Sequence, residues 1–207
     1  MVISILSLTI CHKMISTKPK IARADRMRHW NWSKFIIGGT EVQDFSPFAY
    51  QLSLRYVEVH VCGASIISLN WALSAGHCFE RNVYPDQISF RAGSRDRFEG
   101  GIVVNAEQYF VHPMFDPLSY DFDAAVVRTI EPFVGENVRP VPLIEMSTFV
   151  QPGTIGTISG WGIVVADGVQ VGIVSTGATT CGINYPGVYT NITHPSIRAF
   201  IFQRTGV

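Results

Sequence analysis

The sequence predicts an all-β protein with one helix at its C-terminal end. From Ile36 onward, short apolar or alternating runs rich in Val, Ile, Phe and Tyr are separated by Gly, Pro, Asn or Asp, the pattern of strands joined by turns. With 47% hydrophobic and 15% charged residues among 207, the composition is that of a globular chain. Strands at such short intervals predict a sandwich or a barrel. The strand-like runs are Phe48–Leu54, Val59–Ile67, Ile88–Ala92, Gly101–Tyr109, Asp123–Arg128, Thr154–Ser159 and Gln170–Ser175.

The single helix is expected near the end of the chain. Pro195 and Ser196 supply a start signal, and Ile197, Phe200 and Ile201 fall on one face at helical spacing. Apolar runs of roughly eighteen residues, which a membrane-spanning helix needs, do not occur in the sequence. We therefore expect no membrane span.

The first 35 residues differ from the rest in charge and have no sustained period. They hold seven of the sixteen Lys and Arg residues and one of the sixteen acids, which leaves nine basic and fifteen acidic residues in the remainder. The short apolar run Val2–Ile10 and the sequence Ala22–Ala24 (ARA) are features of a secretory signal, although no basic segment precedes the run. We expect residues 1–35 to be a removable leader or pro-segment. A segment that binds a membrane or polyanion is a weaker alternative, and no nucleic-acid partner is expected because no nucleic-acid-binding motif accompanies the charge.

Two short segments carry candidate catalytic chemistry. Residues Trp71–Cys78 (WALSAGHC) place His77 directly before a cysteine. A general base must be held by rigid neighbours, and a disulfide one residue away would supply that rigidity. Residues Tyr120–Val127 (YDFDAAVV) place Asp123 directly before an apolar run.

These segments resemble the histidine and aspartate motifs of the trypsin/chymotrypsin-like serine proteases, with Gly76 where a second alanine is usual. The resemblance implies that His77 is the general base and Asp123 the acid that orients it, since Asp121 matches the motif less well. It also implies a fold of two six-stranded antiparallel barrels with a C-terminal helix. The partners it implies are protein or peptide substrates, and it implies neither a cofactor nor a metal.

Further segments follow in the order of that family. They are Ile36–Gly39 (IIGG), His112–Pro113, Ser159–Gly162 (SGWG), Val171–Ser175 (VGIVS) and Pro186–Tyr189 (PGVY). By the same resemblance, Ile36 becomes the new N-terminus after cleavage by an activating protease, and the preceding Phe35 suits a chymotrypsin-like cut. Ser175, Gly177 and Gly187 are implied as substrate-binding residues, and the two glycines leave room for a large substrate side chain.

Of the four cysteines, Cys62 and Cys78 have a context that predicts a disulfide. A bridge across that loop contributes roughly 3 kcal/mol on the chain-entropy model and requires an oxidising compartment. Together with the family, this predicts a secreted protein. Cys181 lacks the partner that it would have in the family, so we expect it to stay free or to mispair.

One block of the family pattern is missing near residues 163–164. Gly162 is followed by Ile163 and then at once by residues that resemble those after the family's Gly-Asp-Ser-Gly-Gly-Pro motif. The nucleophilic serine, the oxyanion hole built from backbone N–H groups and the base of the specificity pocket all belong to the missing block. Ser159 and Ser175 match family serines with other roles, so neither is expected to act as a surrogate nucleophile.

The domain organisation expected from these patterns is a leader of residues 1–35 and a peptidase domain of residues 36–207 whose second barrel is incomplete. One interpretation is a secreted serine endopeptidase whose transcript or gene model has lost an exon, which the intact motifs on both sides of the gap favour. The alternative is a non-catalytic homologue that acts as a binding or regulatory module. On either interpretation the chain as written is expected to be inactive.

Overall fold

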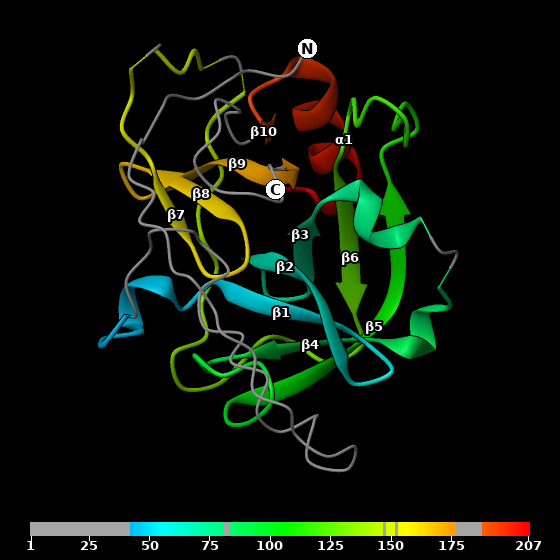
Figure 1. Cartoon of the computed structure of the whole chain (residues 1–207), viewed down its shortest axis with the longest axis vertical. Helices are drawn as coiled ribbons and strands as arrows, with labels where there is room; N and C mark the ends of the chain where they lie inside the picture. The colour runs from blue at the N-terminus through cyan, green and yellow to red at the C-terminus, as the bar shows by residue number, and fades with distance from the viewer. Residues whose placement is uncertain (1–41, 81–82, 147, 152, 177–187) are drawn as a thin grey trace, which may run out of the picture.

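The computed structural model describes residues 42–80, 83–146, 148–151, 153–176 and 188–207. Its strands form a closed six-stranded barrel in the order β1-β2-β3-β6-β5-β4 and a separate four-stranded sheet in the order β10-β9-β8-β7 (Figure 1). All strand pairs in both are antiparallel. The strands are β1 Gln51–Tyr56, β2 Val59–Ser68, β3 Trp71–Ser74, β4 Ile88–Ala92, β5 Ile102–Val111, β6 Ala125–Thr129, β7 Thr157–Ser159, β8 Ile163–Ala166, β9 Val169–Thr176 and β10 Val188–Asn191.

The helical elements are short apart from the last. They are the 3-10 turns η1 Ser46–Phe48, η2 Gly76–Phe79 and η3 Pro85–Gln87, and the helix α1 Pro195–Thr205. The buried face of α1 includes Ile197, Phe200 and Ile201, and Gly206 ends the helix in the left-handed conformation. The predicted all-β class with a C-terminal helix is therefore confirmed. None of the helices in the described ranges has the length and apolar character needed to cross a bilayer.

The two sheets differ in whether they close into a barrel. The first barrel pairs β1 with both β2 and β4, so every one of its strands has two neighbours and no edge is left open. In the second sheet, β7 and β10 each pair with one described strand, so that this sheet stays open within the described residues. The prediction of one complete and one incomplete barrel is confirmed.

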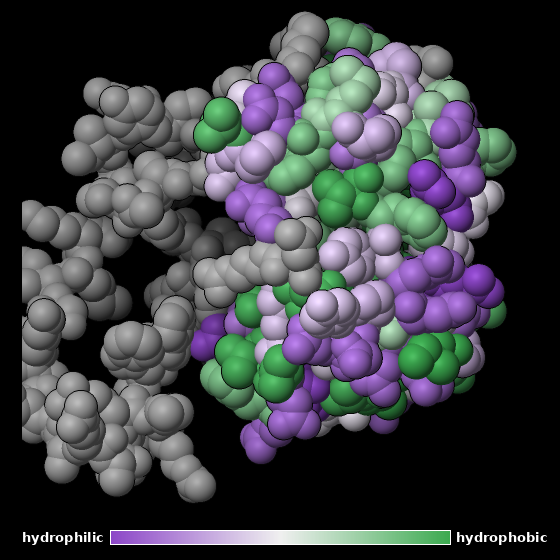
Figure 2. All heavy atoms as spheres, turned by 90° about the vertical axis from the view of Figure 1, so that its right-hand side faces the viewer, coloured by the Kyte–Doolittle hydropathy of each residue, from purple (hydrophilic) through white to green (hydrophobic). Residues whose placement is uncertain are grey.

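One hydrophobic core runs through both sheets and the helix. It joins barrel residues such as Leu52 and Phe90 to Ile173 of β9 and Ile201 of α1. Green and purple residues are mixed over the face of the molecule that Figure 2 presents, a pattern expected where the large apolar side chains lie mainly in the interior. The open sheet therefore shares its core with the barrel.

Polar contacts also tie the open sheet to the barrel. Gln170 of β9 is fully buried, and its side-chain oxygen accepts a hydrogen bond of 2.6 Å from the hydroxyl of Ser65. On the β7–β8 hairpin, the Ser159 hydroxyl accepts a bond of 2.6 Å from Gln51 Nε2 and lies 2.9 Å from the hydroxyl of Tyr50. Because buried polar groups need partners, these bonds fix how the hairpin sits against β1.

Gly63 of β2 packs tightly against the turn of that hairpin. A Cβ atom at Gly63 would lie 2.3 Å from the carbonyl oxygen of Trp161. Because that oxygen belongs to the backbone, no change of side-chain rotamer can relieve the clash. We expect Gly63→Ala to lower the free energy of unfolding by about 1–3 kcal/mol through overpacking, measured by urea unfolding. Gly156→Ala is the matched control, since its Cβ would lie 3.3 Å from a Val164 methyl group and 3.5 Å from the carbonyl oxygen of Val165, a much milder contact. Equal stability of the two variants would contradict this packing.

Candidate active site

The candidate histidine is presented by a turn that follows the buried strand β3. Ala72 and Leu73 are inaccessible to solvent, and the Ser74 hydroxyl donates to the carbonyl of Gly63 at 2.8 Å. Ala75 is extended, and the chain then enters η2, which carries His77. The imidazole is therefore attached to a rigid part of the barrel.

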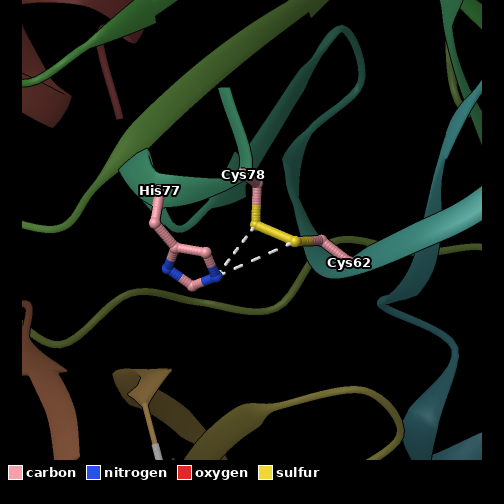
Figure 3. Close-up of side chains that lie close together, drawn as sticks. All are labelled: Cys62, His77 and Cys78. Atoms are coloured by element: carbon pink, nitrogen blue, oxygen red, sulfur yellow. Dashed lines mark hydrogen bonds between the residues drawn. A yellow bond between two sulfur atoms is a disulfide. The ribbon is translucent and has the colours of Figure 1, made fainter. Parts of the chain in front are cut away.

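The predicted disulfide between Cys62 and Cys78 is confirmed and lies directly against this imidazole (Figure 3). It joins β2 to η2 with 6.3 Å between the Cα atoms. His77 Nε2 lies 3.6 Å from Cys78 Sγ and 4.0 Å from Cys62 Sγ. The bridge thus fixes the turn that presents the histidine.

Gly76 departs from the alanine that the family motif leads one to expect, and packing explains the departure. A Cβ atom there would lie 3.2 Å from the side chains of Phe115 and Val111 and 3.3 Å from the backbone nitrogen of Ala124. Glycine lets η2 approach the segment that carries the acid. The substitution therefore fits the neighbouring side chains of this chain.

Asp123 is completely buried and makes two bonds to the histidine. The backbone N–H of His77 donates to Asp123 Oδ1 at 2.7 Å, and His77 Nδ1 donates to Oδ2 at 2.8 Å. The His77 side chain is 27% exposed and the Asp123 side chain is not exposed at all, so the imidazole lies between the buried carboxylate and solvent. Asp121 lies two residues earlier and is only partly buried, and its carbonyl accepts a hydrogen bond from the N–H of Asp116. The predicted contact of His77 with Asp123 is present.

These bonds determine the tautomer of the imidazole. An ionised carboxylate only accepts hydrogen bonds, so the proton of neutral His77 resides on Nδ1. The lone pair then lies on Nε2, which is the atom that a general base uses to accept a proton. The arrangement is chemically that of a base oriented by a buried acid.

Two hydroxyl groups complete the surroundings of Asp123. The Ser175 hydroxyl donates to Asp123 Oδ2, and the Thr190 hydroxyl donates to the Asp123 carbonyl oxygen at 2.8 Å. The substrate-binding role expected for Ser175 from the sequence stays a prediction. The sequence did not predict that the hydroxyls of Ser175 and Thr190 would contact Asp123. Both contacts join residues far apart in the sequence, so no local motif carries them.

The backbone before Asp123 is conformationally strained. Tyr120 and Phe122 have φ values of 60° and 54°, in the left-handed region that non-glycine residues rarely adopt. The conformation turns the Tyr120 ring toward His77, with 5.6 Å between ring centroids. A small hollow of about 20 Å³ lies beside these residues, and its lining includes Ser175, Tyr189 and His194. It has room for a water molecule.

Ser159, considered above as a surrogate nucleophile, is not brought to the pair. Ser159 is buried in the contact with Tyr50 and Gln51 described above. Ile36, Gly177, Cys181 and Gly187, together with the leader, lie outside the described residues, so the expectations about them stay predictions.

A second histidine supports the segment that carries Asp123. His112 is 3% exposed and stacks on the Phe122 ring at 5.0 Å between centroids. Its Nε2 lies 3.1 Å from the Ser196 hydroxyl at the start of α1, and its Nδ1 accepts a bond from the N–H of Met114 at 3.2 Å. Burial lowers the pKa of His112 below its usual value of 6.5, and the nearby His194 acts in the same direction.

This shift makes the fold sensitive to acid. The unfolded chain binds a proton at His112 more readily than the folded chain, so the stabilising contribution is present above pH 6.5 and is lost as the pH falls through the lower folded pKa. We expect His112→Gln to lose less stability than the unchanged chain between pH 7.5 and pH 5, by urea unfolding at each pH. The variant removes only this part of the acid sensitivity, since burial also lowers the pKa of His60 to about 4. An unchanged pH dependence in His112→Gln would contradict the assignment.

The chain is similar to known proteins in sequence. The family model described as Trypsin matches residues 36–169. The chain is 32% identical over 133 residues to a trypsin of Simulium vittatum, a match that covers 61% of this chain and 53% of the relative. It is 33% identical over 134 residues to ovochymase-2 of Mus musculus, covering 61% of this chain and 22% of that protein. The matched region thus spans about half of the first relative and less than a quarter of the second.

The fold is also similar to a solved structure. The crystal structure of the scabies mite inactivated protease paralogue S-D1 superposes with a TM-score of 0.72 at 18% sequence identity. The superposition covers 83% of this chain and 99% of the neighbour. At that identity the likeness concerns the fold alone.

Proposed function

Because this chain belongs to the trypsin family, we propose that it is a serine-endopeptidase relative which, as written, keeps the histidine and the aspartate of the triad without the nucleophilic serine. Its histidine is His77 and its orienting acid is Asp123. The substrates of the family are proteins and peptides, so the ligands of this chain belong to the same class. The family and the disulfide favour a secreted location.

The observation that carries the proposal is the surroundings of His77 Nε2. A serine peptidase needs a hydroxyl within hydrogen-bonding reach of this atom, from which the imidazole removes the proton. Among the described residues, the atoms in hydrogen-bonding range of Nε2 are the two sulfurs of the Cys62–Cys78 disulfide. A disulfide sulfur has no proton to give, so the base has no nucleophile to activate there.

The two serines nearest in the sequence to the missing block have other roles. Ser175 donates its hydroxyl hydrogen to Asp123, on the Nδ1 side of the histidine. Ser159 holds Tyr50 and Gln51 in the contact between the sheets. Neither hydroxyl faces Nε2, which supports the loss of the nucleophile over its replacement.

The chain's activity provides the first test. We expect the purified chain to release no product from peptides with basic or aromatic side chains above a heat-denatured blank. His77→Ala should give the same trace, because the base acts on no nucleophile. Product formation that His77→Ala abolishes would contradict the proposal.

A second candidate function is a non-catalytic binding or regulatory module. The closed first barrel favours it, because that half of the fold has no open edge and can present a stable surface. The similar fold of a protein named as an inactivated protease paralogue is in keeping with it. Sequencing the transcript between the codons for Gly162 and Val164 separates the two. An intact coding block there indicates a complete endopeptidase, and a continuous junction favours the binding module.

A further inference from the structure

Three side chains with metal-binding atoms meet beside the barrel. The sulfurs of Cys62 and Cys78 and a ring nitrogen of His77 all lie within 4.8 Å of one another (Figure 3). In the oxidised chain the two sulfurs are bonded to each other and hold no cation. Reduction would turn the same atoms into two thiol ligands and one imidazole ligand.

We propose that, once the Cys62–Cys78 disulfide is reduced, Cys62, Cys78 and His77 bind a thiophilic divalent cation such as Zn²⁺. A dithiol reductant supplies the two electrons: it becomes a disulfide, and its two hydrogens pass to the protein sulfurs. The cation then binds the two sulfurs as thiolates and displaces two protons. This site needs no peptidase activity and is independent of the proposed function.

The positions of the donor atoms fit a tetrahedral cation. Zinc binds thiolate sulfur at about 2.3 Å and imidazole nitrogen at about 2.0–2.1 Å, which places the nitrogen and each sulfur about 3.5–3.6 Å apart. His77 Nε2 lies 3.6 Å from Cys78 Sγ and 4.0 Å from Cys62 Sγ. The imidazole therefore already stands at nearly the required distance from both sulfurs. Only the sulfurs must move apart, which breaking the covalent bond between them allows.

Asp123 prepares the imidazole for this role. A metal-binding histidine almost always donates its other ring N–H to a carboxylate or carbonyl, which fixes the ring and the tautomer. His77 Nδ1 donates to buried Asp123 at 2.8 Å, so the lone pair of neutral His77 lies on Nε2, facing the sulfurs. The His77 side chain is 27% exposed, so water can reach the fourth position of a tetrahedral site.

The test uses the full chain with Cys11→Ser and Cys181→Ser, so that Cys62 and Cys78 are its only thiols. After reduction under nitrogen and removal of the reductant, Co²⁺ is added as the probe and then displaced with Zn²⁺. We expect one Co²⁺ per chain with thiolate-to-metal absorption bands that zinc removes. The same chain with its disulfide intact should show no such bands. Absence of the bands from the reduced chain would overturn the proposal.

Variants distinguish this site from binding by two thiols alone. We expect His77→Ala to weaken the binding of Zn²⁺ at least tenfold, and Asp123→Asn to weaken it by about 10–100-fold as expected for an orienting carboxylate. His194→Ala, which removes a histidine outside this cluster, should leave it unchanged. Equal affinity of His77→Ala and the unchanged chain would contradict the proposal. If reduction unfolds the chain, added Zn²⁺ should restore its circular dichroism, and failure to do so counts against the site.

Discussion

Asp123→Ala is expected to lower the free energy of unfolding by about 3–5 kcal/mol, because it leaves several buried donors without an acceptor. The Asp123 carboxylate accepts bonds from the backbone N–H and Nδ1 of His77 and from the hydroxyl of Ser175. Its side chain is completely buried, so water cannot simply take its place. Urea or thermal unfolding of the purified variant measures the loss.

The matched control is Asp121→Ala. Asp121 belongs to the same segment but is only partly buried, so its loss should change stability by less than about 1 kcal/mol. The pair of variants also decides between the two candidate acids. A larger loss for Asp121→Ala than for Asp123→Ala would contradict the geometry of the site.

The histidine and its acid could be predicted from the sequence because the short segments around them resemble two motifs of the serine proteases. His77 precedes a cysteine at the end of a strand-like segment, and Asp123 directly precedes an apolar run. The hydroxyl contact of Ser175 could not be predicted, since it depends on how β9 packs against a residue 52 positions away. The same is true of Thr190, which lies 67 positions from Asp123. Contacts of this kind follow from tertiary packing rather than from a motif.

The strands, too, could be predicted from the sequence only in part. The run Ile88–Ala92 coincides with β4, whereas the run from Phe48 to Leu54 begins before β1, because Pro47 places η1 ahead of the strand. The sequence runs did not include β3, β8 and β10, which have four residues each. β3 is almost wholly buried, so it lacks the alternation that identifies a strand with one exposed face.

Inserting the segment that the family pattern leads one to expect after Gly162 should have the largest effect on activity. A segment of a catalytically active trypsin-like protease that contains the Gly-Asp-Ser-Gly-Gly-Pro motif, inserted between Gly162 and Val164, would supply the nucleophile and the backbone N–H groups of the oxyanion hole. We expect this chain, with its N-terminus freed at Ile36, to hydrolyse peptides at least about 10³-fold faster than the chain as written. Initial rates on peptides with basic and aromatic side chains measure the difference.

The control for that comparison is the same grafted chain with the inserted serine replaced by alanine. It keeps the restored strands and the pocket but lacks the nucleophile, so it should fall back toward the rate of the chain as written. A grafted chain that folds and is cut at Ile36 yet stays inactive would favour the non-catalytic module over the endopeptidase that has lost a block.

Covalent labelling by an organophosphorus serine reagent, read as intact mass, shows whether any serine of this chain is an activated nucleophile. We expect no mass increase for the chain as written, because the hydroxyls of Ser159 and Ser175 are hydrogen-bonded to Gln51 and Asp123 and do not face His77 Nε2. We expect one adduct, on the inserted serine, in the grafted chain. An adduct on Ser159, Ser175 or any other residue of the chain as written, lost on His77→Ala, would contradict the claim that this protein has a base and an acid without a nucleophile.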